Sequence, residues 1–278
     1  MNAPAGFLDQ MAASSRARVA EARAREPDAA LEARARAMPP PPPLRLTGRF
    51  DLIAEMKLRS PALGTLGSAQ DDLVARVTGY AGAGAAAVSV LTEPSRFDGD
   101  LDHLRRAAAA LAPLGVPAMR KDFLVDPYQL HEARAAGAGG ALLIVRMLGE
   151  PLLAGMVDCA LRLGLFVLLE AFDAGDVRIA RRVLAGWQPG MPPALLGINS
   201  RDLQTLEVVP ERLVELGPTL PRNFPRVAES GLVTPEDAAR MVRAGYDMAL
   251  VGGALMGAAD PGQLVRDMLD AGRRAAGA

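Results

Sequence analysis

Residues 116–147, VPAMRKDFLVDPYQLHEARAAGAGGALLIVRM, contain the structural unit that repeats along this chain. An apolar run, residues 116–122, ends in Arg120, Lys121 and Asp122, a segment of helical period follows, and a second apolar run begins at Gly140. Short, nearly continuous apolar runs are typical of strands buried on both faces, and a helix between two of them indicates a parallel pair. Three charged side chains at the end of a buried strand are unusual and point to a function.

Eight runs of this kind occur between residues 51 and 253. They cover residues 51–57, 85–93, 116–122, 140–147, 165–171, 194–200, 225–230 and 248–253. The average spacing of roughly 28 residues leaves room for a helix and two loops between strands. The pattern predicts an α/β protein with a (β/α)8 TIM barrel, a fold of about 250 residues. The alternative, a doubly wound open sheet, would need a G-x-G-x-x-G turn after the first strand, and MKLRSPALGTLG, residues 56–67, lacks it.

The start of the chain differs from the rest and is predicted to form an N-terminal helical extension. Residues 1 to about 37 have a mostly helical pattern with a break at Pro27. The segment MPPPPPLRL, residues 38–46, ends the helix, because proline lacks the backbone N–H that a helix needs. We therefore divide the chain into residues 1–48, the extension with its proline-rich spacer, and residues 49–278, the catalytic barrel.

Composition narrows the classes of partner. The 278 residues include 31 lysines and arginines and 32 aspartates and glutamates, so no net field would attract nucleic acid or an anionic membrane. No run approaches the roughly 20 apolar residues of a membrane span. A lone cysteine, Cys159, and two histidines in predicted helices argue against a disulfide, a zinc cluster and a multi-histidine metal site. These features favour a cytoplasmic protein with a small-molecule partner.

Polar or glycine residues follow every predicted strand, and in a barrel the carboxyl ends of the strands form the active site. In strand order they are Glu55 and Lys57; Thr92 and Glu93; Lys121 and Asp122; Arg146; Glu170; Asn199 and Arg201; Glu229 and Ser230; and Gly252 and Gly253. The first, third and fifth strands thus supply two carboxylates and two amines, which can exchange protons without a metal or cofactor. The alternatives are a ring of structural salt bridges at the barrel mouth, or a Schiff base on Lys57 or Lys121.

The last two loops predict a phosphate site. They read AESGLVTPEDA and LVGGALM, and they offer the Ser230 hydroxyl and the unhindered N–H groups of Gly231, Gly252 and Gly253. Many barrels hold a phosphate at the loops after strands seven and eight, so a phosphorylated small molecule is expected. The alternative is that these glycines only make tight turns.

Several segments in combination resemble the indole-3-glycerol-phosphate synthase family of tryptophan biosynthesis. They are IAEMKLRSP, SVLTEPSRFDGDLDHL, RKDFLVDPYQLHEARAAGAGGALLIV, LLEAFD, LGINSRDLQTLEV, and VAESGLVTPEDA with LVGGALM. The resemblance covers essentially the whole chain, including the N-terminal extension. It implies a carboxy-lyase that needs no cofactor. That enzyme closes the ring of 1-(o-carboxyphenylamino)-1-deoxyribulose 5-phosphate, with loss of carbon dioxide and water, to give indole-3-glycerol phosphate.

The resemblance also implies roles for individual residues, with Lys121 as the acid that protonates the substrate ketone. The implied catalytic residues are Glu55, Lys57, Lys121, Glu170 and Asn199. The implied substrate-binding residues are Ser60, Phe97, Phe123, Leu142 and Arg201, of which Phe97, Phe123 and Leu142 would hold the anthranilate ring. Ser230, Gly231, Gly252 and Gly253 would bind the phosphate. Arg120 and Asp122 would support the site rather than react.

Two loops depart from the family pattern. Ala62 and Leu63 stand where a serine and a lysine are usual, which removes polar contacts that help to cover the substrate. Gly252, Gly253 and Ala254 stand where glycine, glutamate and serine are usual, which removes a hydroxyl and about 1 kcal/mol of binding. A paralogue that acts on a modified anthranilate in a specialised pathway would have the same features.

Other readings remain beside this one. A phosphoribosylanthranilate isomerase would use a cysteine and aspartate pair, and Cys159 is far from any predicted strand end. A Schiff-base lyase is a second rival. A non-catalytic phosphometabolite-binding barrel, acting as a partner or regulatory subunit, is the alternative from another class. The expected assembly state is a monomer or weak homodimer.

Overall fold

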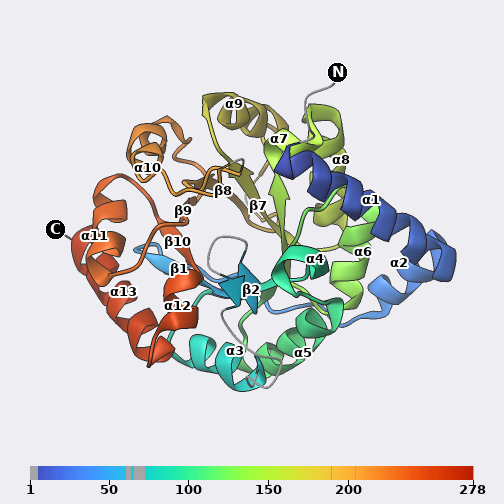
Figure 1. The fold of residues 1–278 in the computed structure, drawn as a ribbon, viewed down its shortest axis with the longest axis horizontal. Coiled ribbons are helices and arrows are strands. Elements are labelled where there is room, and N and C mark those ends of the chain that lie inside the picture. Colours follow the sequence, from blue (N-terminus) through green and yellow to red (C-terminus); the bar gives the residue numbers. More distant parts are fainter. Residues whose placement is uncertain (1–5, 61–63, 66–72, 189, 204, 278) are drawn as a thin grey trace.

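A closed barrel of parallel strands forms the centre of the protein (Figure 1). The computed structural model describes residues 6–60, 64–65, 73–188, 190–203 and 205–277. Within these ranges eight strands pair in the order β1-β10-β9-β8-β7-β6-β5-β4, and β4 closes on β1. They are β1 (Asp51–Met56), β4 (Ala87–Leu91), β5 (Ala118–Lys121), β6 (Gly140–Ile144), β7 (Phe166–Ala171), β8 (Ala194–Asn199), β9 (Arg226–Glu229) and β10 (Met248–Val251). The TIM-barrel prediction is confirmed, and each predicted apolar run contains one strand.

Helices between the strands form an outer ring. They are α3 (Leu73–Gly82), α5 (Leu101–Leu111), α6 (Pro127–Ala135), α8 (Glu150–Arg162), α9 (Ala174–Val183), α10 (Glu211–Leu216), α11 (Pro235–Arg243) and α13 (Pro261–Ala276). Short elements lie in the loops: α4 (Pro94–Phe97), α7 (Val145–Leu148), α12 (Gly253–Gly257), the 3-10 turns η1 (Ala112–Leu114) and η2 (Gly217–Thr219), and the small antiparallel pair of β2 (Arg59–Ser60) and β3 (Gly64–Thr65). In the described ranges, no helix has both the length and the apolar character that a membrane span requires.

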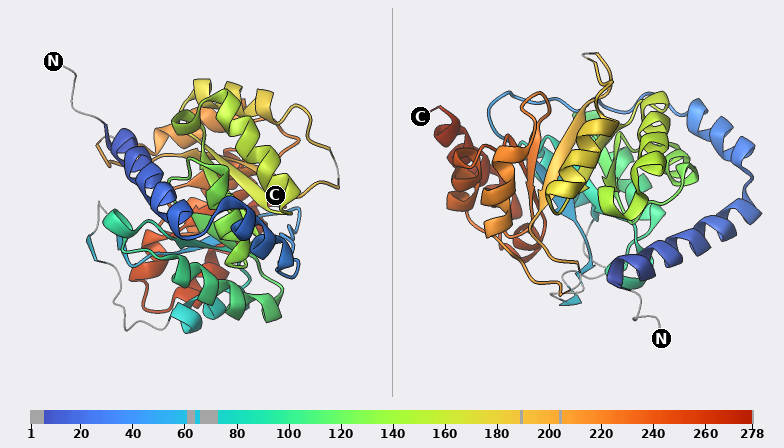
Figure 2. Two further views of the ribbon diagram at one scale, coloured as in Figure 1. Left: turned by 90° about the vertical axis from the view of Figure 1, so that its right-hand side faces the viewer. Right: turned by 90° about the horizontal axis from the view of Figure 1, so that it is seen from above.

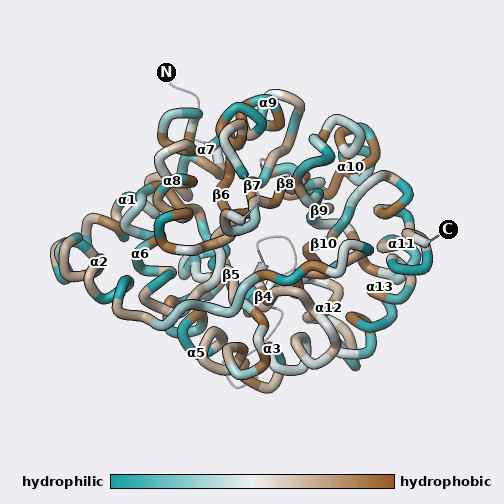
Figure 3. Tube along the Cα trace, turned by 180° about the vertical axis from the view of Figure 1, so that it is seen from behind, coloured by the Kyte–Doolittle hydropathy of each residue, from teal (hydrophilic) through white to brown (hydrophobic). Residues whose placement is uncertain are grey.

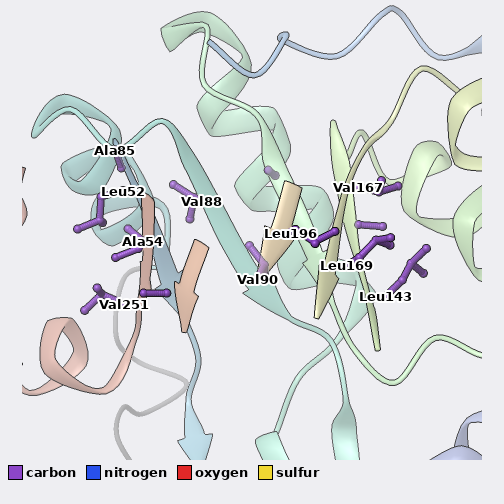
Figure 4. Packing of buried hydrophobic residues seen from close by; sticks show 14 of the residues in the cluster. Leu52, Ala54, Ala85, Val88, Val90, Leu143, Val167, Leu169, Leu196 and Val251 are labelled. Carbon is purple, nitrogen blue, oxygen red and sulfur yellow. The ribbon is translucent and has the colours of Figure 1, made fainter. Parts of the chain in front are cut away.

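Each strand divides its side chains between two cores. Alternate residues point outward or inward, so Leu52, Ala54 and Val88 pack against the helices, as Figure 4 shows, while Ile53 and Met119 fill the barrel interior. The helices pack one apolar stripe on the strands and expose the other face, and in Figure 3 they alternate between teal and brown along their turns. Buried glutamates of three strands, Glu55, Glu170 and Glu229, lie near the carboxyl ends of these strands.

Local sequence signals start the ring helices at defined residues. The side chains of Asp100, Asp126, Asp173, Thr234 and Asp260 each accept a hydrogen bond from an N–H of the helix that follows. In three of these cases a proline occupies the first turn, where its missing N–H costs nothing.

The N-terminal extension forms two helices that pack on the outside of the ring. They are α1 (Phe7–Arg25) and α2 (Asp28–Ala37), and the predicted break at Pro27 is confirmed. Both lie on the side of the barrel that carries α6 and α8 (Figure 1, Figure 2). Arg23 donates to the Asp126 carboxylate at 2.7 and 2.9 Å, and the Gln129 amide donates to the Ser15 hydroxyl at 2.9 Å. The extension is therefore held by polar contacts as well as by apolar packing.

Asp122 joins this extension to the barrel. Its buried carboxylate accepts two hydrogen bonds from Arg18, at 2.8 and 3.0 Å, and one from the Thr92 hydroxyl at 2.8 Å. The guanidinium of Arg120, itself only 1% exposed, lies 3.3 Å away. Burial works to raise the pKa of Asp122, but the hydrogen bond from Arg18 and the charges of Arg120 and Arg18 outweigh it, so the pKa is lowered. The interpretation of Arg120 and Asp122 as supports agrees with these contacts.

Substituting Asp122→Asn should lower the free energy of unfolding by about 3 kcal/mol, because it removes the carboxylate that Arg18 and Arg120 share and leaves Arg120 with Glu132 alone. Urea unfolding measures this loss. Asp28→Asn is the matched control, because it breaks an exposed ion pair with Arg23. The Arg23 side chain is 38% exposed and the Asp28 side chain 55% exposed. This substitution should lower the free energy of unfolding by less than about 1 kcal/mol. Equal losses in the two variants would contradict the role given to the buried network.

The same carboxylate predicts a pH dependence. Because the pKa of Asp122 is lowered in the folded state, its contribution is present above the unfolded aspartate pKa of about 3.9 and is lost as pH falls through the folded value. The stability difference between the native protein and Asp122→Asn should therefore shrink in acid. Unfolding curves at pH 7 and below pH 4 test this.

Candidate active site

A cavity of about 430 Å³ opens at the carboxyl ends of the barrel strands. This volume is in the range of sites for small metabolites. All but one of the predicted site residues line it: Glu55, Lys57, Phe97, Lys121, Phe123, Leu142, Glu170, Asn199, Arg201, Ser230, Gly231, Gly252 and Gly253. The exception is Ser60, which belongs to β2 but whose side chain is outside the described part of the structure. Ala62 and Leu63, the two departures in the first loop, are also outside the described residues.

The strand order separates the cavity into opposite sides. In the closed barrel β5 lies across from β9, and β6 lies across from β10. The apolar residues Phe123 and Leu142 therefore face the glycine loops that follow β9 and β10. The ionisable residues Glu55 on β1 and Glu170 on β7, which are also opposite strands, lie between these two ends.

Lys121 is the central cation of the cavity. Its ammonium nitrogen lies 3.3 Å from Glu170 Oε2. Burial works to lower the pKa of Lys121, but the charges of Glu170, Glu229 and Glu55 outweigh it, so the pKa is raised. The ammonium form therefore persists at neutral pH as a proton donor, and it is a poor nucleophile.

Glu55 and Lys57 form a second pair on β1 and the residue that follows it. The Lys57 ammonium donates to Glu55 Oε1 at 2.5 Å. Burial works to raise the pKa of Glu55, but the charges of Lys57 and Lys121 lower it, so Glu55 is a carboxylate. A side chain at Gly252 would overlap this carboxylate and would lie 3.0 Å from Lys57 Nζ, which explains glycine here. Lys57 and Lys121 are the only two lysines among the 278 residues, and both line the cavity.

Glu229 is a third carboxyl group of the cavity that the predicted site omitted. It is 1% exposed, and a side chain at Gly197 on the neighbouring strand would overlap it. Burial and the adjacent Glu170 carboxylate raise its pKa well above the usual range, against the opposing charge of Lys121. Its position at the end of a strand, directly before Ser230, was the available sequence signal.

Aromatic rings form the apolar side of the cavity. The Phe123 ring lies 6.2 Å from Phe97 and 5.7 Å from Phe7, the latter edge to face at 77°. Leu142 and Ile144 on β6 complete this side. Phe7 belongs to α1, so the N-terminal extension supplies part of the cavity wall. Sequence reasoning missed it, because helical periodicity does not show where a helix packs.

The glycine loops form the other side. Ser230 and Gly231 both have a positive φ, 68° and 79°, so two successive peptide groups turn sharply after β9. A Cβ at Gly231 would lie 2.8 Å from Val208 Cγ1, so only glycine fits. The Ser200 hydroxyl donates to the Ser230 carbonyl at 3.1 Å and fixes the turn. Successive backbone N–H groups in such turns suit an anion.

Arg201 stands between the charged centre and the glycine loops. Its guanidinium donates to the Leu206 carbonyl at 2.7 Å, and Leu206 adopts a left-handed φ of 64° that directs this carbonyl. Burial lowers the pKa of Arg201, against the opposing charge of Glu55. Its backbone N–H donates to Asn199 Oδ1 at 2.9 Å, which links the two predicted residues.

Three polar residues named at the strand ends do not line the cavity, contrary to the prediction. Strand β6 ends at Ile144, and Arg146 belongs to α7, where its guanidinium pairs with Asp173 and Asp176 and stacks on Phe172. Thr92 instead donates its hydroxyl to Asp122. Glu93 caps α4. Arg146 and Thr92 thus bind carboxylates in the loops of neighbouring strands, whereas Glu93 binds N–H groups of its own loop.

The whole sequence is similar to that of one enzyme family. The family model described as Indole-3-glycerol phosphate synthase matches residues 8–268. The chain belongs to the indole-3-glycerol phosphate synthase family. A family member from Mycobacterium leprae (strain Br4923) is 39% identical over 273 residues, covering 97% of this chain and 96% of that one. Another, from Parafrankia sp. (strain EAN1pec), is 42% identical over 224 residues, covering 81% of this chain and 79% of that one.

The fold is also similar to that of more distant barrels. A 3-hexulose-6-phosphate synthase from Salmonella typhimurium has a TM-score of 0.60 at 11% identity and covers 81% of this chain and 99% of that one. Thiamine phosphate pyrophosphorylase from Pyrococcus furiosus has a TM-score of 0.58 at 16% identity, with coverage of 82% and 96%. At such low identity these structures share the fold with the indole-3-glycerol phosphate synthase family and carry no information on its chemistry.

The raised pKa of Glu229 predicts how the stability of this family member changes with pH. A carboxyl whose folded pKa is raised contributes stability that is present below the unfolded value of about 4.3 and is lost as pH rises through the folded value. Glu229→Gln should therefore become more stable relative to the native protein as pH rises from 4 to 8. Urea unfolding across this range measures the trend, with Glu236→Gln, at an exposed position of α11, as the control for losing one carboxyl group. A constant difference would contradict a protonated Glu229.

Proposed function

We propose that the chain is an indole-3-glycerol-phosphate synthase that works by proton transfer from Lys121. The observation that carries this proposal is a buried ammonium group of raised pKa among three carboxyl groups, between an aromatic wall and the turn at Ser230 and Gly231. Its substrate, 1-(o-carboxyphenylamino)-1-deoxyribulose 5-phosphate, has a flat ring at one end and a phosphate at the other. The two ends match the opposite sides of the cavity.

The proposed binding mode follows from this match. The anthranilate ring lies against Phe97, Phe123 and Leu142, with Phe7 closing the slot. The phosphate binds the N–H groups of Gly231, Gly252 and Gly253 and the Ser230 hydroxyl. Anchoring both ends of the substrate places the ketone carbon next to the ring carbon that attacks it, which lowers the entropic part of the barrier.

In the proposed reaction the ring carbon that bears the carboxylate bonds to the ketone carbon, and the carbonyl electron pair moves to oxygen. Lys121 gives that oxygen a proton, so negative charge never builds up unbalanced in the cavity. The bond to the carboxylate then breaks, carbon dioxide leaves, and its electron pair restores the aromatic ring. Loss of the new hydroxyl as water, with removal of a proton from the adjacent carbon, completes the indole.

The dehydration needs both an acid and a base, and the cavity holds groups of each kind. Glu55 and Glu170 are the proposed bases, and Lys57 beside Glu55 is a proposed second donor to the departing hydroxyl. Glu229 is a further proposed proton donor, because its raised pKa keeps a proton on a carboxyl group inside the cavity. Asn199 and Arg201 are proposed to bind the hydroxyl-bearing chain and to support the site, with Ser60 in the first loop.

The rival readings are weaker for physical reasons. A Schiff base needs a neutral amine, whereas the charges of Glu170 and Glu55 help to hold Lys121 as an ammonium. The isomerase reading needs a cysteine at the cavity, and Cys159 is 3% exposed in α8. A non-catalytic role leaves the cluster of proton-transfer groups without a use. A paralogue for a modified anthranilate remains the second candidate, since it would share this site.

The remaining proposals concern the setting of the enzyme. We propose that it acts in the cytoplasm on a phosphorylated metabolite, without metal or cofactor, and as a monomer or weak homodimer. The balance of 31 basic and 32 acidic residues supports the absence of a nucleic-acid partner. Residues 1–48 are proposed as a distinct extension and residues 49–278 as the catalytic barrel.

Turnover is tested by adding the substrate to metal-free protein and following the indole fluorescence of the product. Lys121→Ala should lower kcat by about two to four powers of ten, the usual contribution of a positioned acid. Lys121→Arg keeps the charge but releases a proton far less readily, so it should be almost as slow. Near-normal turnover of Lys121→Ala would refute the assignment of the acid, and detectable binding without turnover in the native protein would favour the non-catalytic reading.

Borohydride treatment during turnover separates proton transfer from covalent catalysis. A Schiff base would leave a reduced adduct on a side-chain amine, and this chain has only Lys57 and Lys121 to carry one. Mass spectrometry of the two peptides should find both lysines unmodified. An adduct on either lysine would replace the proposed mechanism with a Schiff-base route.

A further inference from the structure

Glu93 is a buried carboxylate that the proposed chemistry does not use. It follows β4 as the N-cap of α4 and is 1% exposed. Its Oε1 accepts hydrogen bonds from the Ser95 N–H at 2.9 Å and the Ser95 hydroxyl at 2.6 Å, and its Oε2 accepts one from the Arg96 N–H at 2.7 Å. All these donors belong to a single helical turn. Because a buried carboxylate is costly unless its hydrogen bonds are made, this group is tied to the shape of that turn.

The turn is also closed at its far end. The N–H of Gly99 donates to the Glu93 carbonyl at 2.9 Å. A Cβ at Gly99 would lie 2.6 Å from the Leu91 carbonyl oxygen, so no other residue fits, and Asp98 before it adopts a left-handed φ of 53°. Residues 93–99 therefore form a compact loop. Glu93 holds the start of this loop through its carboxylate and the end of the loop through its backbone carbonyl.

This loop supplies Phe97 to the cavity. Of the described residues in the loop, Phe97 is the one that lines the cavity, and its ring lies 6.2 Å from Phe123 with an interplanar angle of 39°. The orientation of Phe97 therefore depends on the turn that Glu93 caps. The proton-transfer residues stand on other strands, so a change in this turn leaves them in place.

We propose that Glu93 is a positioning residue that holds Phe97 against the aromatic ring of the substrate. The inference rests on the proposed function, because it takes the apolar side of the cavity as the site of the anthranilate ring. Without the carboxylate, the N–H groups of Ser95 and Arg96 lose their acceptor, and the turn no longer holds Phe97 in one orientation. Ring binding weakens while proton transfer from Lys121 is retained, so KM rises and kcat changes little.

A double-mutant cycle tests this with the complete chain. Phe97→Ala should raise KM about tenfold, and Glu93→Ala should raise it by a similar factor, with kcat within about threefold of the native value. The double variant should be no worse than Phe97→Ala alone, because Glu93 acts through Phe97. Glu93→Gln keeps one carbonyl oxygen as an acceptor and should give an intermediate KM, and it serves in place of Glu93→Ala if that variant does not fold.

The matched control removes a carboxylate cap from the next helix. Asp100 caps α5 by accepting a hydrogen bond from the Asp102 N–H at 2.6 Å, and Asp100 does not line the cavity. Asp100→Ala should lower Tm as a lost cap does, but leave KM unchanged. This separates loss of a cap in general from loss of the cap that orients Phe97.

The outcomes are distinct. An unchanged KM in Glu93→Ala, a fall in kcat alone, or additive effects in the double variant would overturn the role of Glu93. An unchanged KM in Phe97→Ala would also overturn the role of Glu93, because Phe97 would then not bind the substrate ring. Absence of product from the native protein would instead refute the proposed function itself.

Discussion

Pairing of β1 with β10 closes the sheet, and the active site depends on that closure. It places residues 51–54 beside residues 248–251 and so brings Gly252 against the Glu55 carboxylate. Parallel pairing directs the carboxyl ends of the barrel strands to one rim, and closure fixes which strands face each other across it. The separation of an aromatic side from the glycine loops across the cavity is a consequence of strand order.

Charge balance inside that rim sets the chemistry. Neighbouring carboxyl groups, Glu170 first among them, raise the pKa of Lys121, whereas burial and the charge of Glu170 raise the pKa of Glu229 against the opposing charge of Lys121. The groups thereby differ in proton affinity although they are close together, and this allows one cavity to donate and accept protons in a single reaction. Glycines at positions 197 and 252 provide the space that these buried carboxyl groups occupy.

The sequence predicted the barrel and most of the site for the same reason: buried strands are apolar, so polar residues mark where they end. That rule finds Lys121, Glu170 and Asn199. It does not distinguish a side chain that turns toward the barrel axis from one that a neighbouring loop engages, and Arg146 was placed wrongly for this reason. Phe7 shows a further limit, because its position depends on how a separate helix packs against the barrel.

The bond between Arg18 and Asp122 joins residues 104 positions apart in the chain. During synthesis at about 5 to 20 residues per second, Arg18 is added to the chain roughly 5 to 20 seconds before its partner. The first helix to be translated therefore has no binding surface until β5, the third barrel strand along the chain, has been made. Newly made chains would therefore pass through a stage in which α1 is made but not docked, and in which Phe7 does not yet close the aromatic side of the cavity.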